Sequence, residues 1–357
     1  MSVDAKTVER QENFGKAVLE AIPGLLLVVV VAVIAWYGDA YLKKNYKKFY
    51  DVVLLNYVLL AIIIGMIIRN TVGIPNVLEP GLKYSTVMTK TGIVVMGTKY
   101  TLASLVKVGT VSMVFITITL FGTVALLFAI RKHFKMSDEL GGCLASGFSV
   151  CGVSAIVATG PALRARGQEM AYGIATILIF GMLALFTMPY IGHALGLTQN
   201  QFGAWVGVGI VNSAQVLAAG FAFGKEAGLL AGIFNMGRVV LLPFVVLAVV
   251  LIVLRGSTSS SENINKTQFI MDKFPLFIIA FMLAVLANTA GMFTKAELLM
   301  ADKVMIWAFS LGFASIGLTT RFSDMKAAGK DGIILGFIVG LVKAVLALIA
   351  IKWFLPL

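Results

Sequence analysis

Two glycine-rich segments carry the small polar side chains that could bind a ligand at membrane depth. The first, residues 147–155, contains Ser149, Cys151, Gly152 and Ser154. Glycine breaks a helix, and the break leaves unpaired N–H groups at the positive end of the helix dipole. Hydroxyl groups can add further donors, so the pattern favours an anion site. Small residues also serve close helix packing, which is the alternative interpretation.

The second segment, residues 207–215, ends in Asn212, Ser213 and Gln215. Amide side chains are costly in hydrocarbon unless they are partnered, so their presence here needs a reason. They offer donors for an oxyanion, or they form hydrogen bonds that only join helices.

Three further polar residues interrupt later apolar segments. Arg238 lies within an apolar stretch, close to Asn235, and Lys343 lies near the middle of the last one. An ionisable residue at such depth is a functional candidate, and the arginine fork matches oxyanions well. The alternative is that the charge extends to the nearer membrane surface. We rank Arg238 above Lys343, because Arg238 follows the second glycine-rich segment.

Carboxylates are placed differently. Each of six acidic residues lies near the end of an apolar run: Asp39, Asp51, Asp138, Glu139, Glu169 and Glu226. Carboxylate-based ion exchange in the core is therefore disfavoured, whereas sodium bound by carbonyls needs no carboxylate. The two His and two Cys residues have no metal-site spacing, and no Walker-A loop is present. We expect no enzyme activity, no cofactor and no metal.

The composition is that of a membrane protein. Hydrophobic residues make up 59% of the 357 residues and charged residues only 13%, against roughly 45–50% and 25% in soluble domains. The net charge of +12 comes from Lys and Arg at the ends of apolar runs. Such charges face lipid headgroups, so we do not expect nucleic acid as a partner.

The apolar runs predict an all-α polytopic membrane protein with about nine to eleven membrane segments. We expect spans near residues 21–42, 51–69, 85–106, 108–130, 168–194, 226–254, 274–293, 303–320 and 331–354, with a Ser-rich loop at 255–273. The segments 138–164 and 200–223 are the two glycine-rich ones. Each is predicted to be discontinuous.

Internal similarity divides the chain. Gly92, Gly97 and Gly109 recur at a constant spacing as Gly312, Gly317 and Gly329; Asn70–Gly73 resembles Asn288–Gly291. The two glycine-rich segments also resemble each other. We therefore predict an N-terminal polar segment with an extra first span (1–50), a first repeat (51–194, with broken segment 138–164) and a second repeat (195–357, with broken segment 200–223). The repeats are inverted if both broken segments are re-entrant hairpins, which we favour over two single-crossing broken helices.

The charge distribution modestly favours a cytoplasmic N-terminus. That orientation places most of the interhelical Lys and Arg residues inside, at the expense of the Lys43–Lys48 cluster. The expected location is the inner or plasma membrane.

The chain resembles a known family at these residues. Ser149–Ile156, Asn212–Val216 and Arg238–Val239 are similar to motifs of the sulfate exporter family of uncharacterised bacterial and archaeal membrane proteins. The resemblance covers most of residues 50–355 and implies kinship with the superfamily of bile-acid, arsenite and cation-antiporter transporters. Family members often carry His-Asp where this chain has Val211-Asn212, and a Lys where it has Asn235. These departures affect the expected substrate and coupling.

Residues and resemblance together predict a secondary transporter of a small anion, a sulfur oxyanion or sulfonate, working by alternating access. The alternatives are a passive anion channel and a sodium-coupled carboxylate transporter. The expected partners are the small anion and membrane lipid, and superfamily kinship also allows a homodimer.

Overall fold

The computed structural model describes residues 2–46, 56–134, 136–256, 275–325 and 330–354. These residues form helices and connecting turns, with no strand among them. Contacts divide the chain into two compact units. Unit 1 comprises residues 1–95 and 296–321, and unit 2 comprises residues 96–295 and 322–357. Most of the predicted loop at 255–273 lies outside the described residues.

The helices of unit 1 come from both ends of the chain. They are α1 (Ser2–Asn45), α3 (Tyr57–Ile67), the π-helical turn η1 (Ile68–Val72), α4 (Glu79–Leu82), α5 (Ser85–Met96) and α16 (Lys295–Thr319). At the boundaries, Met96 and Lys295 belong to unit 2. Asn56 begins α3 by accepting hydrogen bonds from Val58 N (3.1 Å) and Leu59 N (3.2 Å). Trp36 on α1 contacts Tyr57 and stacks on Trp307, with ring centroids 4.9 and 5.7 Å apart.

Helices α3 and α16 cross at two glycines. A Cβ atom on Gly65 would lie 2.7 Å from Leu318 N, and one on Gly317 would lie 2.3 Å from Ile62 O. The backbones therefore touch with no room for a side chain. Small residues at a crossing allow this close approach. Helices in lipid have no hydrophobic driving force to associate, so the van der Waals contacts of such a crossing stabilise the pair instead.

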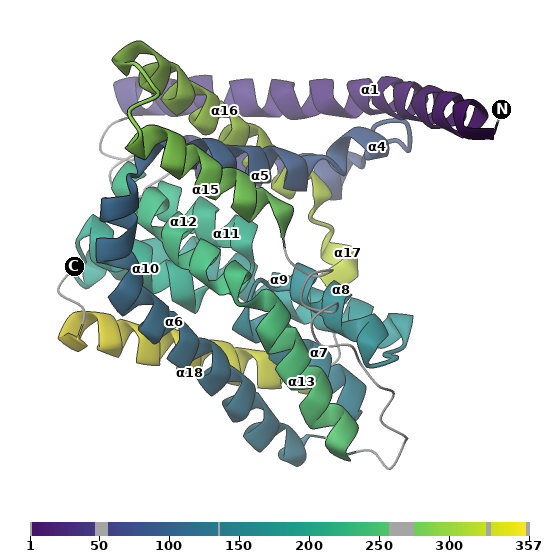
Figure 1. Cartoon of the computed structure of the whole chain (residues 1–357), viewed down its shortest axis with the longest axis vertical. Helices are drawn as coiled ribbons and strands as arrows, with labels where there is room; N and C mark the ends of the chain where they lie inside the picture. Colours follow the sequence, from purple (N-terminus) through teal and green to yellow (C-terminus); the bar gives the residue numbers. More distant parts are fainter. Residues whose placement is uncertain (1, 47–55, 135, 257–274, 326–329, 355–357) are drawn as a thin grey trace. The chain divides into compact units, whose positions relative to one another are not determined.

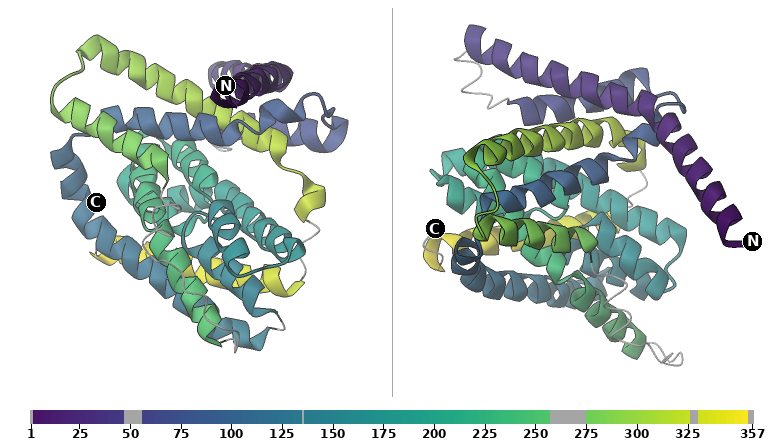
Figure 2. Two further views of the ribbon diagram at one scale, coloured as in Figure 1. Left: turned by 45° about the vertical axis from the view of Figure 1, so that its right-hand side comes forward. Right: turned by 45° about the horizontal axis from the view of Figure 1, so that its top comes forward.

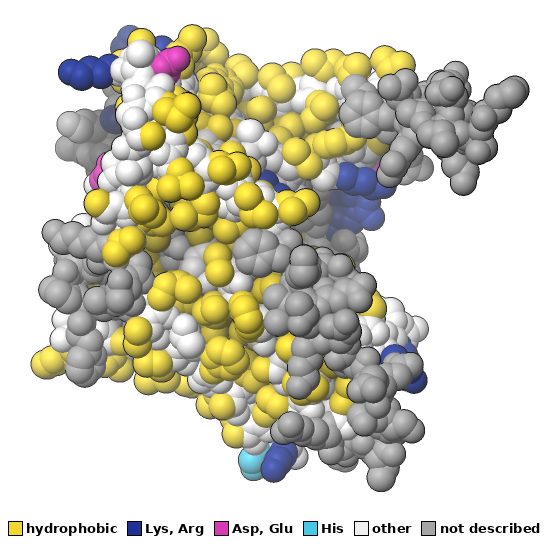
Figure 3. Space-filling view, viewed as in Figure 1, with side chains coloured by type: hydrophobic (Ala, Val, Ile, Leu, Met, Phe, Trp, Pro, Cys, Tyr) yellow, Lys and Arg dark blue, Asp and Glu magenta, His cyan; other side chains and the backbone are white. Residues whose placement is uncertain are grey.

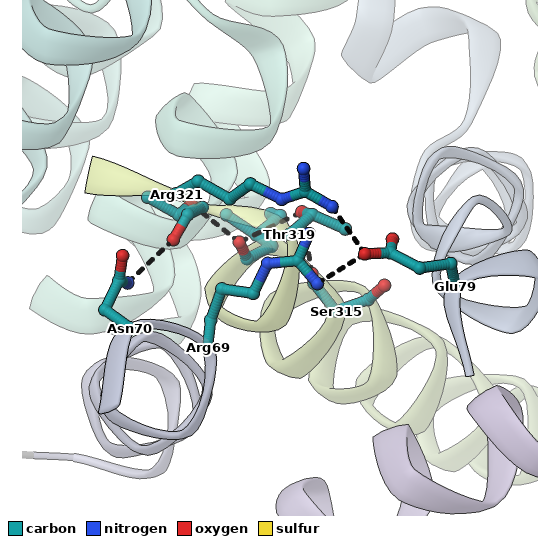
Figure 4. Close-up of polar contacts among 8 residues, drawn as sticks. Arg69, Asn70, Glu79, Ser315, Thr319 and Arg321 are labelled. Atoms are coloured by element: carbon teal, nitrogen blue, oxygen red, sulfur yellow. Dashed lines mark hydrogen bonds and ion pairs between the residues drawn. The ribbon is translucent and has the colours of Figure 1, made fainter. Parts of the chain in front are cut away.

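An ion cluster holds the end of α16 within unit 1 (Figure 4). Glu79 accepts from Arg69 of η1 at 2.7 Å and also pairs with Arg321, which follows α16. The Arg69 side chain is only 5% exposed, so its positive charge is shielded from water and is balanced by the carboxylate of Glu79. Close by, Asn70 Nδ2 donates to Thr320 O at 2.9 Å. Partial burial raises the pKa of Glu79, but the hydrogen bonds and charges of the two arginines outweigh it and hold that pKa below its usual value.

Unit 2 is larger. Its helices are η2 (Gly97–Lys99), α6 (Leu102–Ile130), η3 (Arg131–His133), α7 (Asp138–Ser149), α8 (Val153–Ala162), α9 (Gly167–Ala194), α10 (Gln199–Gly209), α11 (Ser213–Phe223), α12 (Lys225–Val240), α13 (Leu242–Gly256), α15 (Leu276–Thr289), α17 (Phe322–Met325) and α18 (Lys330–Phe354). Within it, α10 and α11 pack on α12, and α6 lies beside α18 (Figures 1 and 2).

Several helices have the length and composition of membrane spans. Five described helices qualify, and a sixth span results if α12 and α13, which are bent by 45° at their junction, are one span. The predicted span at 226–254 is therefore two helices that meet at Leu241. The face shown in Figure 3 is covered mainly by apolar side chains, as expected where lipid is the solvent. The chain is thus an all-helical membrane protein; the larger count of nine to eleven segments stays a prediction.

Both glycine-rich segments fold as helical hairpins. In the first, Gly142 on α7 packs against Leu163 just after α8. In the second, Phe202 near the start of α10 stacks on Phe223 at the end of α11, with centroids 3.9 Å apart. A single broken helix would hold such residues roughly 30 Å apart at 1.5 Å per residue. Of the two predicted alternatives, the hairpin is therefore the one that forms.

We predict that Gly65→Ala destabilises the protein by about 1–3 kcal/mol, because its methyl group has no space at the α3–α16 crossing. Gly38→Ala is the matched control, since its Cβ would meet only Leu60 Cδ1, at 3.7 Å. Thermal unfolding in detergent compares the two. Equal melting temperatures would contradict this account of the crossing.

We also predict that the Glu79 cluster makes stability sensitive to acid. Because the folded state lowers the pKa of Glu79, its contribution is complete above the ordinary glutamate value of about 4.5 and is lost as the pH falls below it. Glu79→Gln should lower stability at pH 7 by about 1–3 kcal/mol, since the amide oxygen still accepts a hydrogen bond but Arg69 and Arg321 lose the negative charge, and should flatten the acid-induced loss. Exposed Glu226→Gln is the control, and an unchanged acid profile in Glu79→Gln would refute the prediction.

Candidate functional site

Each hairpin of unit 2 turns at a short non-helical tip. After α7 the chain leaves helical geometry at Val150, and Gly152 has a φ of 72°. That left-handed conformation is open to glycine and strained for most other residues. After α10, Ile210 is extended, and Asn212 then caps α11 by accepting from Ala214 N at 3.0 Å. Each turn thus places a helix C-terminus beside a helix N-terminus.

The two tips meet inside unit 2. A Cβ atom on Gly152 would lie 3.3 Å from Asn212 Cα and 2.9 Å from Ile177 Cγ2 of α9. Each helix of the second hairpin has about 11 residues, and such a helix is roughly 16 Å long, about half the hydrocarbon thickness. The geometry matches the expected meeting of two half-depth hairpins.

The second hairpin is aligned along α12. Gly207 on α10 packs against Phe234, whereas Leu217 and Phe221 on α11 pack against Gly232 and Gly228. Along α11 the residue numbers rise as those of their partners on α12 fall, so the two helices are antiparallel. If the same spacing continues toward the start of α11, its first turn lies at the level of Arg238.

Arg238 covers the carbonyl end of α10. Its side chain is completely buried. Nη1 donates to Ile210 O at 2.6 Å and to Val208 O at 3.4 Å, and Nη2 donates to Asn235 Oδ1 at 3.0 Å. The last carbonyls of a helix have no intrahelical partner and carry about half a negative charge. The guanidinium supplies both the donors and the opposite charge.

Lys343 donates to the carbonyl end of α7 in a similar way. The residue is 2% exposed, and Nζ donates to Phe148 O at 2.8 Å and to Ser149 O at 3.2 Å. Its helix α18 is also joined to the second hairpin, because Trp205 Nε1 of α10 donates to Ala344 O at 2.8 Å. Sequence reasoning ranked Lys343 below Arg238 and left it out of the site. Its depth in an apolar span was the signal.

Four predicted site residues have buried polar atoms without a hydrogen-bond partner among the described residues. They are Ser213 Oγ, Gln215 Oε1, Asn235 Nδ2 and Arg238 Nε. Gln215 is otherwise held by α9, where its Nε2 donates to Leu178 O at 3.4 Å. Buried polar groups in proteins are nearly always satisfied, so such atoms indicate places for water or a ligand.

The remaining predicted residues lie at the first tip with different exposures. Cys151 is buried in the turn, and Ser154 is exposed in the first turn of α8. Ser149 is buried, but its hydroxyl donates to Ala145 O at 2.5 Å and is not available as a donor. The structure thus brings the tips together, while Ser149 contributes its carbonyl rather than its hydroxyl.

The described residues contain no group of three or more His, Cys, Asp or Glu side chains that could hold a metal ion. The two cysteines, Cys143 and Cys151, are both buried and do not form a disulfide.

Comparison with known proteins gives the family. A family described as Conserved hypothetical protein 698 matches residues 23–336. A UPF0324 membrane protein of Nitratidesulfovibrio vulgaris is 53% identical over 357 residues, which are 99% of each chain. A second protein of that name and organism is 34% identical over 97% of this chain and 98% of its own. The UPF0324 inner membrane protein YeiH of Escherichia coli (strain K12) is 27% identical over 89% of both chains. No solved structure matches. The match across most of its length shows that this chain belongs to the UPF0324 family of membrane proteins, described as Conserved hypothetical protein 698.

Proposed function

We propose that the protein is a secondary transporter of a small anion, with a sulfur oxyanion or sulfonate as the substrate class. The observation that carries the proposal is the pair of buried cations, Arg238 and Lys343, at the meeting hairpin tips. The buried charged residues of unit 2 within the described part of the chain include one carboxylate, Glu169, and it is already paired with Arg166 at 3.0 Å.

A charge count at the tips supports an anion. The C-termini of α7 and α10 contribute about one negative charge together, and the N-termini of α8 and α11 about one positive charge. With both Arg238 and Lys343 protonated, the sum is about two positive charges. A buried charge without a counter-ion is strongly unfavourable, so the site gains most from a ligand of negative charge.

The donors are suited to an oxyanion. Ser213 Oγ, Asn235 Nδ2 and Arg238 Nε are N–H or O–H groups that have no partner within the described part of the chain, and α8 begins without a side-chain cap. Oxyanions accept several hydrogen bonds at once, and those to charged groups are stronger. In this proposal Gln215, Asn212, Cys151, Gly152 and Ser154 form the surrounding wall.

Sodium coupling through the broken-helix carbonyls is less well supported. In discontinuous-helix transporters, such carbonyls coordinate the coupling cation. Here the carbonyls of Val208, Ile210, Phe148 and Ser149 already accept from Arg238 and Lys343. The protein's own side chains thus occupy those acceptors. A carboxylate substrate coupled to sodium remains the alternative that the binding experiment below distinguishes.

The proposal includes inverted repeats and alternating access, and one pair of contacts favours the repeats. Asn70 Nδ2 donates to Thr320 O, and Asn288 Nδ2 donates to Tyr100 O, at 2.9 and 3.0 Å. Asn70 corresponds to Asn288 in the predicted repeats, and Tyr100 corresponds to Thr320. The same asparagine-to-carbonyl hydrogen bond therefore occurs twice. In one case the first repeat supplies the donor, and in the other the second repeat does. We place the protein in the inner or plasma membrane with a cytoplasmic N-terminus, and a homodimer is part of the proposal.

We predict that one sulfur oxyanion or sulfonate raises the melting temperature of the purified protein, in a screen that includes sulfate, sulfite, thiosulfate, taurine, small carboxylates and sodium. A ligand at one hundred times its Kd adds about 2.7 kcal/mol to apparent stability. Ser213→Ala should weaken that ligand about tenfold, because a hydrogen bond to a charged group is worth about 1.5–3 kcal/mol. Ser310→Ala is the matched control, since its hydroxyl donates within its own helix to Ile306 O at 2.8 Å.

A protein that is well folded and stabilised by none of these anions would overturn the anion proposal. Stabilisation by a carboxylate or sodium alone would replace it with the alternative.

We further predict that reconstituted protein exchanges labelled anion faster when unlabelled anion is present on the opposite side. Alternating access requires this acceleration, because a loaded carrier returns to the other side as it exchanges substrate. A passive channel conducts without it. An anion flux that does not saturate, and that unlabelled anion on the opposite side does not accelerate, would indicate a passive channel instead of a transporter.

A further inference from the structure

We propose that Lys343 is the proton-binding residue of the anion site: its amine is neutral when the site is empty and takes up a proton when the anion binds. Protons would then move with the anion. This inference rests on the proposed function and adds the identity of the coupling ion and of the residue that carries it.

The hydrogen bonds of Lys343 match a neutral amine. Nζ makes two bonds among the described residues, to Phe148 O and Ser149 O. A neutral amine has two N–H donors and one lone pair, whereas an ammonium has three donors. The two carbonyl acceptors therefore satisfy both N–H groups of the neutral amine. The ammonium form would have a third N–H group that is buried without an acceptor among the described residues. A bound oxyanion would provide the missing acceptor.

The electrostatic surroundings also favour the neutral amine in the empty site. Lys343 is buried, and its neighbour Ala344 lies at the end of α10 that Arg238 covers, because a Cβ atom on Gly209 would be 3.6 Å from Ala344 Cα. Arginine stays protonated under almost all conditions, so of the two cations the lysine is the one that can lose its proton.

The other titratable groups on the elements packed against α18 do not replace it. Helix α7 carries Asp138 and Glu139 in its first turn and Cys143 further along, and the first tip carries Cys151. Helix α9 carries Tyr172 near its start, where the hydroxyl accepts from Gly332 N, and the exposed Tyr190 and His193 near its end. Glu169 on α9 is bonded to Ser137 and Arg166. Neither α10 nor the described side chains of α6, residues 112–130, include an ionisable group.

The arrival of an anion reverses the balance. Its negative charge offsets Arg238, and its oxygen accepts the third donor of Lys343. A proton from bulk water then binds to the Nζ lone pair, forming one N–H bond, and returns to water when the anion leaves. No oxidant, reductant or other reactant takes part.

The experiment is calorimetric titration of the wild-type protein with the anion identified by the thermal screen, in two buffers of different ionisation enthalpy. The difference between the observed heats counts the protons taken up. We expect up to one proton per anion, and an affinity that falls by up to about tenfold per pH unit as the pH rises. Wild type that binds the anion with no proton uptake at any pH between 6 and 9 would overturn the assignment.

Two variants locate the proton. Lys343→Arg keeps a fixed positive charge, so it should bind the anion without proton uptake. Lys352→Arg, on the exposed last turn of the same helix, is the matched control and should retain the uptake. Proton uptake that persists in folded Lys343→Arg would move the proton to another residue and overturn the inference.

The outcomes separate the two proposals. If wild type binds no anion, the proposed function and this inference both fall. If wild type binds the anion with no change in protonation, only the inference falls. Should Lys343→Arg not fold, the wild-type proton count still decides.

Discussion

The arrangement of unit 2 depends on covering the carbonyl ends of two broken helices. A helix that stops inside a membrane exposes carbonyls that neither water nor lipid can satisfy. Here each end is covered by a basic side chain from another helix: Arg238 of α12 covers α10, and Lys343 of α18 covers α7. The cations and the breaks need each other, because a buried charge is as unfavourable alone as an unpaired carbonyl. The hairpins, their supporting helices and the tip-to-tip contact follow from this pairing.

Under the proposed function, the same pairing links stability and ligand binding at this place. A substitution of Arg238 would remove a structural cap and a charge of the proposed site together, so its effect on activity alone could not be interpreted. Ser213 differs, because its hydroxyl has no partner in the described structure. Unit 1 also contains a buried arginine, Arg69, but its partner is a carboxylate and not a set of backbone carbonyls. Glu79 forms ion pairs with both Arg69 and Arg321 near the end of α16. One buried arginine has a carboxylate, whereas the other has only uncharged acceptors, the carbonyls of Val208 and Ile210 and the amide oxygen of Asn235. This contrast is the reason to look for an anion beside Arg238.

Sequence reasoning located the two helix breaks and the buried Arg238 because the signals for them are local. Glycine clusters inside apolar runs mark helix breaks, and Asn212 directly before a helical run marks an N-cap. It misjudged Ser149, whose hydroxyl is used by its own helix, because the rotamer of a serine is not written in the residues around it. It also gave Lys343 too little weight. The predicted repeats could not help, since the position that corresponds to Lys343 in the first repeat, Thr123, is uncharged.

The sequence by itself determined that the protein is helical and membrane-embedded, that its two glycine-rich segments are broken, and which residues bring polar atoms into apolar segments. These properties depend on composition and on neighbours within a few residues. The sequence did not predict the break between α12 and α13. Only the tertiary structure decided that the broken segments turn back as hairpins, that Gly152 meets Asn212, and that Lys343 reaches carbonyls 194 and 195 residues away. Periodicity carries no information about such pairs. Which cation covers which helix end is settled only when distant helices pack together and each buried polar group takes the partner within reach.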